Sequence, residues 1–423
     1  MATSRRLSGR WLPEIIAMQN LDYQAVQVRL QSYMPALDGL RAFAIIWVML
    51  HNGGLDSALD THALTGKLLA PVLTMGWMGV QLFFVLSGFL ITGILLDAKR
   101  NQVESLYKHF YMRRFLRIFP VYYVFLCLSF IAVIIFPHAP AWLQDTYAHK
   151  WWHVFYLNNW VQPFQEVGYG HLWSLAVEEQ YYIFWPLVVI ALSLSRLYYA
   201  CLIMVGVTML FRFAAIDYDP ELAKSAAYVL TPARLDALAM GSMLAIMLRD
   251  PGAFQTTRKF INVVATSSVI YILIILATLR EYLSVSTEWT VLNQTAAAMF
   301  FTGLLYYSLN LKKTDARQSI FTRVLITPWI RSIGKYSYAM YIFHAPVTNL
   351  LHGYLVTRMY VWFAFLGKGA SMAVFCMDLV LLYAITFALA WCSWRVIERP
   401  FLNLKRYFPM RVKYVPVGNI GGI

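Results

Sequence analysis

The sequence predicts an all-α fold, a polytopic transmembrane helical bundle of about ten spans with both termini in the cytoplasm. Of the 423 residues, 60% are hydrophobic and 13% are charged, whereas about 25% of the residues of a soluble domain are charged. Several apolar stretches reach the roughly 20 residues that a helix needs to cross a hydrocarbon core. Lipid is therefore the expected surrounding of most of the chain.

Ten long apolar runs define the expected helices, because each is nearly free of charge over the length of a span. They cover residues 36–52, 72–96, 118–136, 172–193, 197–215, 234–248, 260–279, 289–309, 334–352 and 370–394. The aromatic segment 151–161 is too short to span. We expect it to lie at the headgroup level within a long outer loop, where Trp and Tyr are favoured.

The basic residues indicate the orientation of these helices. Of the 35 Lys and Arg residues, 26 fall in the tails and loops of one side and 6 in the loops of the other. Because Lys and Arg concentrate on the cytoplasmic side of a membrane, the richer side is predicted to be cytoplasmic. We expect a basic cytoplasmic tail over 1–35, a membrane domain over 36–400 and a second basic cytoplasmic tail over 401–423.

Composition also argues against several classes of protein. The net charge of +14 is spread between apolar segments, so no nucleic-acid partner is expected. The four cysteines lie in apolar stretches without paired metal-ligand spacing, which is typical of small buried hydrophobes and predicts no metal site. No signal peptide is expected either, since the apolar run near residues 11–18 is short and interrupted by Pro13 and Glu14.

The first predicted helix carries Arg41 and His51. An ionisable group inside a bilayer costs a few kcal/mol on insertion scales, so each is a functional hypothesis. Arg41 is expected near the cytoplasmic face, either as a snorkelling anchor or as a substrate ligand. His51 lies about 15 Å further along the axis, either as a packing residue or as a general base.

The predicted helix 172–193 carries a polar stripe on one face. His171, Ser174 and Glu178 are spaced three and four residues apart, so their side chains share a helix face. Glu178 would lie about 10 Å below the outer end of the helix, at a depth that His51 can reach. A carboxylate there would orient the imidazole and raise its basicity. Glu179 is expected to point elsewhere and to be structural.

Three arginines, Arg113, Arg114 and Arg117, are expected in the cytoplasmic loop just before a helix that Pro120 starts. They are either a positive-inside anchor or a clamp for phosphates, which guanidinium groups bind in a bidentate manner. His344 is expected about 13 Å from the cytoplasmic face, lining a tunnel or bonding to Ser337. The glycines and serine of residues 79–93 favour close helix packing, with direct ligand contact as the alternative.

Taken together, these motifs resemble the acyltransferase 3 family of bacterial membrane O-acyltransferases, which includes O-antigen, exopolysaccharide and nodulation-factor acetylases. The likeness follows the apolar region in order. It runs through Leu37-Asp-Gly-Leu-Arg41, Phe83-Phe-Val-Leu-Ser-Gly-Phe89, Arg113-Arg-Phe-Leu-Arg-Ile-Phe-Pro120, His171-Leu-Trp-Ser-Leu-Ala-Val-Glu-Glu-Gln180, Arg234-Leu-Asp-Ala-Leu238, Ser337-Tyr-Ala-Met-Tyr-Ile-Phe-His344 and Glu398-Arg-Pro-Phe401.

The resemblance implies about ten spans, an acyl-CoA donor on the cytoplasmic side and a catalytic histidine at His51. In the family, ten residues typically separate an arginine from that histidine, whereas nine separate Arg41 from His51, which turns one side chain by about 100° relative to the other. Some relatives carry an additional extracytoplasmic domain, and this chain is expected to be the stand-alone form.

The function expected from these observations is acyl transfer in the bacterial cytoplasmic membrane. The acyl group, expected to be acetyl, would move from acetyl-CoA to a hydroxyl of a saccharide or lipid-linked glycan, with no bound cofactor. His51 and Glu178 would be catalytic, and the arginines together with His171, Ser174 and His344 would bind substrate. The alternative is a transporter or flippase of a lipid-linked sugar, which would move its substrate without needing CoA.

The division of basic residues generates a test of topology. Reporter fusions after residues 145 and 225 are expected to report an outer location, and a fusion after residue 320 an inner one, because positive loops stay in the cytoplasm. An outer location for the fusion at 320 would contradict the ten-span arrangement.

Overall fold

The computed structural model describes residues 23–28, 30–53, 75–278, 287–309, 319–351, 358 and 368–410. Within these residues the secondary structure is helical and contains no strand. Each of the ten predicted segments overlaps a helix; residues 72–74 of the second, residue 279 of the seventh and residue 352 of the ninth lie outside the described residues. The ten helices are α2 (Pro35–Asn52), α4 (Met78–Arg100), α5 (Leu106–Ile135), α9 (Trp173–Ala191), α10 (Leu194–Tyr218), α12 (Leu235–Met247), α13 (Pro251–Thr278), α14 (Thr287–Leu309), α16 (Pro328–Leu350) and α18 (Lys368–Ser393).

Four stretches of the described chain are long and apolar enough to cross a membrane. They are Met75–Arg100, Leu106–Ile135, Leu194–Tyr218 and Cys376–Tyr407. A fifth crossing is possible if Leu222–Val229 and Thr231–Met247, which meet at 67°, form one broken span. The protein is therefore a helical, multi-pass membrane protein by length and composition.

Short helices join the long ones. Between α5 and α9, the aromatic segment that we expected at the headgroup level forms α7 (Lys150–Val154) and α8 (Asn158–Val161), preceded by α6 (Ala141–Ala148). The sequence patterns did not predict α11 (Pro220–Val229) or α15 (Ile320–Leu325). Further short turns are η2 (Met75–Trp77), η3 (Gly170–Leu172), η4 (Thr231–Arg234), the π-helical η8 (Trp394–Glu398), α19 (Arg399–Asn403) and η9 (Leu404–Tyr407).

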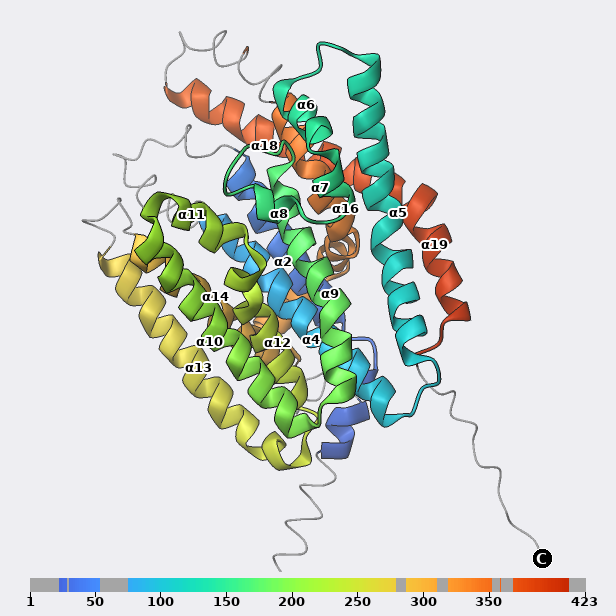
Figure 1. Ribbon diagram of the computed structural model, residues 1–423, viewed down its shortest axis with the longest axis vertical. Helices are drawn as coiled ribbons and strands as arrows, with labels where there is room; N and C mark the ends of the chain where they lie inside the picture. The colour runs from blue at the N-terminus through green and yellow to red at the C-terminus, as the bar shows by residue number, and fades with distance from the viewer. Residues whose placement is uncertain are drawn as a thin grey trace, which may run out of the picture.

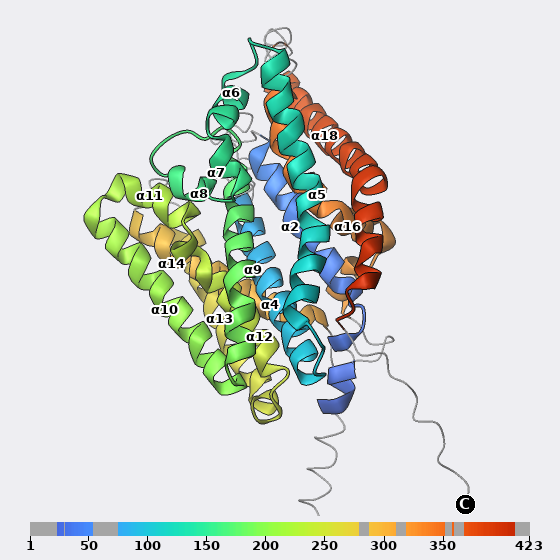
Figure 2. The same cartoon turned by 45° about the vertical axis from the view of Figure 1, so that its right-hand side comes forward.

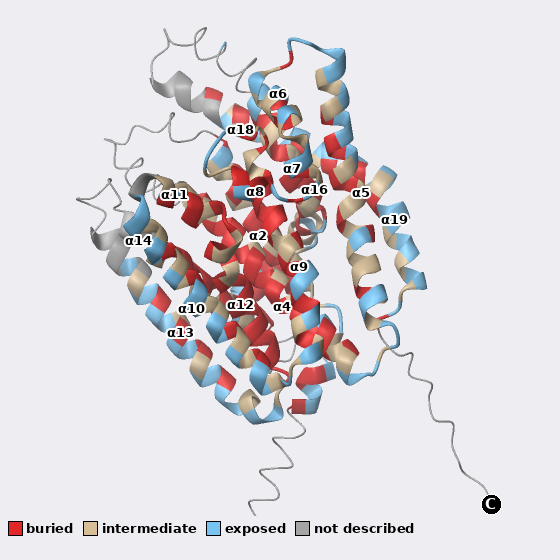
Figure 3. Ribbon diagram, viewed as in Figure 1, coloured by how far each residue is buried: buried red, intermediate tan, exposed pale blue. Residues whose placement is uncertain are grey.

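Helix α4 is the centre of the bundle. It packs against α2, α9, α12 and α14, and Figures 1 and 2 show it running through the middle of the molecule. Buried residues gather along α2, α4 and α12, as Figure 3 shows in red. The outer helices α5 and α10 instead expose large apolar side chains such as Leu128 and Leu210, as helices facing lipid would.

Glycine contacts bring α4 and α12 close together. A Cβ atom on Gly88 would overlap the carbonyl oxygen of Leu238, and one on Gly241 would overlap that of Val85. The two backbones can touch only because neither position has a side chain. The expectation that glycine in the second apolar helix serves close packing is confirmed at Gly88.

Hydrogen bonds join the chain segments at one end of the bundle. The ammonium group of Lys99, at the end of α4, donates to the carbonyls of Val189 and Leu192 near the end of α9, at 3.0 and 2.8 Å. The first described segment joins this end, since Tyr23 donates to the carbonyl of Arg249. The C-terminal segment meets the start of α5, where the His109 ring donates to the carbonyl of Pro409 at 2.8 Å.

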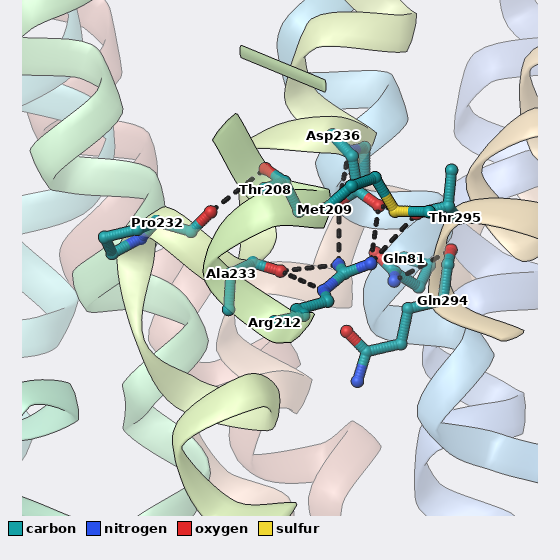
Figure 4. A network of polar contacts seen from close by, with 10 residues as sticks. Gln81, Thr208, Met209, Arg212, Pro232, Ala233, Asp236, Gln294 and Thr295 are labelled. Atoms are coloured by element: carbon teal, nitrogen blue, oxygen red, sulfur yellow. Dashed lines mark hydrogen bonds and ion pairs between the residues drawn. The ribbon is translucent and has the colours of Figure 1, made fainter. Parts of the chain in front are cut away.

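A fully buried ion pair lies between α10, α12 and α14 (Figure 4). The guanidinium of Arg212 lies 3.0 Å from the carboxylate of Asp236, and both side chains are fully buried. Arg212 also donates to the carbonyl of Ala233 and to the hydroxyl of Thr295, which in turn donates to Asp236. A buried pair persists when such added bonds satisfy both partners, and we assign this one to holding the three helices together.

The glycine contact predicts a specific defect. Gly241→Leu is expected to lower the melting temperature of the purified protein in detergent, because overpacking a dense core costs about 1–3 kcal/mol even without a backbone overlap. Gly206→Leu on α10 is the matched control, since a Cβ there meets nothing within 4 Å. Equal melting temperatures for the two variants would contradict the close packing of α4 and α12.

Candidate active site

A cavity of about 100 Å³ lies between α2, α4, α5, α9 and α16. It extends along α4 from Val80 to Leu90, ten residues or about 15 Å of helix axis. Charged and hydroxyl side chains are mixed with apolar ones in its wall. The polar lining residues are Arg41, Ser87, Arg114, Arg117, Ser174, Glu178, Glu179, Tyr182, Ser337, Tyr338 and Tyr341.

The basic end of the cavity comes from α5. This helix begins at Leu106 and continues through Pro120, so the expectation of a loop followed by a proline-started helix is wrong. The charges hid the first turns of the helix from a search for apolar runs. Arg114 and Arg117 line the cavity, and the guanidinium of Arg114 lies 5.0 Å from the centre of the Tyr182 ring.

Arg113 faces a different part of the molecule. Its guanidinium donates to the carbonyls of Lys405 and Phe408, at 3.2 and 3.1 Å, and it is not among the residues that line the cavity. The three arginines are therefore divided: Arg113 holds the C-terminal segment, while Arg114 and Arg117 present positive charge to the cavity.

Arg41 joins this positive end from α2. Its guanidinium forms an ion pair with Asp38 one turn earlier, at 2.9 Å, and both side chains are partly exposed. Since Arg41 also lines the cavity, it can meet an anionic ligand there. Three guanidinium groups thus converge on one end of the cavity.

Glu178 lies in the cavity and not beside His51. Its Oε1 accepts a bond of 2.6 Å from the hydroxyl of Ser87, which itself accepts one of 2.9 Å from Tyr182. Among the described residues no hydrogen bond joins Glu178 to His51, so the structure does not form the expected carboxylate–imidazole pair. Glu178, five residues from the start of α9, faces Ser87 of α4, whereas His51 lies at the C-terminal end of α2. Glu179, expected to point elsewhere, also lines the cavity.

Hydroxyl groups mark the opposite end of the cavity. Ser174, one turn nearer the start of α9 than Glu178, lies 2.6 Å from the hydroxyl of Tyr341 on α16. The Tyr341 hydroxyl is also 2.8 Å from the carbonyl of His171, to which it donates. These bonds tie the start of α9 to the middle of α16.

Beyond this end lies a cluster of two histidines and an asparagine. The rings of His171 and His344 have centroids 5.1 Å apart. His344 donates through Nδ1 to the carbonyl of Tyr341 at 2.6 Å, so its neutral ring can accept through Nε2 from the amide of Asn52, 3.3 Å away. His171 donates through Nε2 to the carbonyl of Ile342 at 3.3 Å.

His51 is the neighbour of Asn52 and the second-to-last residue of α2. Its Nδ1 is buried and has no hydrogen-bond partner in the described part of the chain. A Cβ on Gly76 would overlap the Cβ of His51, so only glycine permits η2 to pass so close to this residue. The Asn52–His344 bond fixes this end of α2 to α16. Like His171 and His344, His51 is not among the residues that line the cavity.

Several cavity residues escaped the sequence analysis. Tyr182, Tyr338 and Tyr341 line the cavity but lie in largely apolar helices whose single hydroxyls indicate no particular chemistry. Only their positions within the motifs could have marked them. Within the described residues, no group of three or more His, Cys, Asp and Glu side chains is placed to hold a metal ion.

Comparison with known proteins identifies relatives of this arrangement. The family model of an acyltransferase domain, Acyl_transf_3, matches residues 34–395. A peptidoglycan O-acetyltransferase of Listeria monocytogenes is 28% identical over 422 residues, covering 92% of this chain and 60% of that protein.

Two relatives come from Staphylococcus aureus. A putative O-acetyltransferase of strain MSSA476 is 28% identical over 87% of this chain and 57% of its own length. The O-acetyltransferase OatA of strain NCTC 8325 is 28% identical over 77% of this chain and 52% of its own. The chain thus spans between half and two thirds of these relatives, and no solved structure matches it significantly.

Proposed function

Because the chain belongs to the Acyl_transf_3 family of acyltransferase domains, we propose that it is a membrane O-acetyltransferase that moves an acetyl group from acetyl-CoA to a hydroxyl of a glycan. The relatives named O-acetyltransferases support the reaction, and the name of the Listeria protein supports a glycan acceptor. We place the protein in a bacterial cytoplasmic membrane, with ten spans and both termini in the cytoplasm.

One observation carries this proposal: a cavity with three guanidinium groups at one end and a histidine-rich cluster beyond the other. The phosphates of CoA are suited to Arg41, Arg114 and Arg117, because guanidinium binds phosphate strongly. CoA joins its phosphates to its thiol through a long pantetheine arm. Phosphates and thioester therefore belong at opposite ends of the cavity.

His51 is the proposed general base. It removes the proton from the acceptor hydroxyl as the oxygen attacks the thioester carbonyl; the C–S bond then breaks, and the CoA thiolate takes the proton from the imidazolium. Histidine suits this exchange because its pKa lies near neutral pH. His171 and His344 belong to the surrounding acceptor site, and Glu178 belongs to the cavity.

The different positions of Arg113 and Arg117 generate a test of acetyl-CoA as the donor. Arg117→Ala is expected to raise the apparent KM for acetyl-CoA by about 10- to 150-fold, the effect of losing a hydrogen bond to a charged group. Arg113→Ala is the control, because that guanidinium bonds to the carbonyls of the C-terminal segment. An unchanged KM in the Arg117 variant, at equal protein level, would contradict phosphate binding and indicate that these arginines serve only to set the topology.

The role of His51 as general base is tested by measuring acetyl transfer in membrane vesicles with labelled acetyl-CoA. His51→Ala is expected to insert normally and to lose about 100- to 10,000-fold in the rate of acetyl transfer to a glycan, as general bases contribute. His138→Ala, an exposed histidine outside the cavity, should keep the wild-type rate. Transfer by His51→Ala at the wild-type rate would contradict the assignment and favour His171.

A further inference from the structure

Several polar side chains between the two ends of the cavity are not used by the proposed reaction, and one of them, Glu178, has a hydrogen-bonded carboxylate. Along α9, Tyr182 lies beside Arg114 at the basic end, Glu178 follows one turn outward and Ser174 another turn outward. Each step is about 6 Å of helix axis. A molecule that reaches from the arginines toward His51 must therefore pass the Glu178 carboxylate.

We propose that Glu178, held in place by Ser87, is the subsite for an amide N–H of the pantetheine arm and so selects donors of the CoA type. This inference rests on the proposed function, since it takes acetyl-CoA as the donor. It assigns Glu178 to donor recognition and separates it from the base at His51.

The chemistry of the arm supports this subsite. The arm contains two secondary amides, and an N–H that leaves water for a mostly apolar cavity needs a new acceptor. The cavity wall next to Glu178 is otherwise apolar along α4, where Phe83, Phe84 and Leu86 line it. A carboxylate is an acceptor with two oxygens, and bonds to a charged acceptor are the stronger kind.

The surroundings of Glu178 keep its carboxylate in one position. Ser87 donates to Oε1 at 2.6 Å, and Tyr182 donates to Ser87 at 2.9 Å. Ser87 of α4 is thus fixed by Tyr182 of α9 and in turn holds Oε1 of Glu178. A ligand amide can use Oε2 while Oε1 keeps its bond to Ser87, and a site that is already ordered loses little entropy when it binds.

The test is a binding competition that needs no acceptor. Purified protein in lipid nanodiscs is saturated with labelled acetyl-CoA, which is displaced by unlabelled acetyl-CoA or by analogues in which one pantetheine amide is replaced by an ester. Each replacement removes a single N–H donor. Wild type is expected to bind one of the two ester analogues at least about tenfold more weakly than acetyl-CoA, the factor for a hydrogen bond to a charged group.

Variants distinguish the loss of the Glu178 hydrogen bond from a general disruption of the binding site. Glu178→Ala is expected to bind acetyl-CoA as weakly as wild type binds that ester analogue, and to show no preference between the two. Glu178→Gln keeps the shape and one acceptor oxygen, and should keep a reduced preference. Ser129→Ala is the control: this buried serine of α5 also meets a tyrosine hydroxyl, at 3.1 Å from Tyr169, but lies outside the cavity, and the variant should keep the full preference.

The outcomes are distinct. A wild type that binds acetyl-CoA but shows no preference against either ester analogue would overturn the subsite. So would Glu178 variants that weaken acetyl-CoA and the analogue equally, because Glu178 would then act on the site as a whole. A wild type that binds no acetyl-CoA would instead refute the proposed donor, and with it this inference.

Discussion

Charge buried inside an apolar helical bundle must find a partner, and this constraint governs how the molecule is built. A buried ion left alone costs several kcal/mol. The described core pairs some of its ions and keeps others around space that a ligand can enter, while the buried guanidinium of Arg234 has no hydrogen-bond partner there and lies against the rings of Trp173 and Tyr228. Arg212 and Asp236 represent the first solution, closed off by Ala233 and Thr295. The cavity represents the second, with Arg41, Arg114 and Arg117 at one end.

The two solutions depend on the same central helix. Gly88 lets α4 touch α12, which carries Asp236, while the neighbouring Ser87 faces α9 and Glu178. One turn of α4 therefore serves packing on one side and the cavity on the other. A change in the α4–α12 contact would move the wall of the cavity as well, which links the stability of the bundle to the geometry of its site.

The ten helices were predictable from the sequence because apolar runs of span length leave few alternatives. The start of α5 was not, because Arg113, Arg114 and Arg117 resemble a charged loop when only hydropathy is considered. The short helices α6, α11 and α15 were missed for a related reason: their length is below what periodicity can resolve. The common face of Ser174 and Glu178 was predictable from helical spacing, and both do line the cavity. Which residue each one meets was not predictable, since that depends on how α9 packs. Glu178 is bonded to Ser87 of α4, and the end of α2 that carries His51 is fixed by Asn52 and His344.

The separation of the arginines from His51, about 15 Å along α2 between Arg41 and His51, is the geometric core of the proposed reaction. A structure determined with CoA bound measures this directly. The account predicts density for the CoA phosphates against Arg114 and Arg117, the arm passing Glu178, and the sulfur near His51 at the outer end of α2. Density for CoA outside this cavity, or with its sulfur beside the arginines, would contradict it.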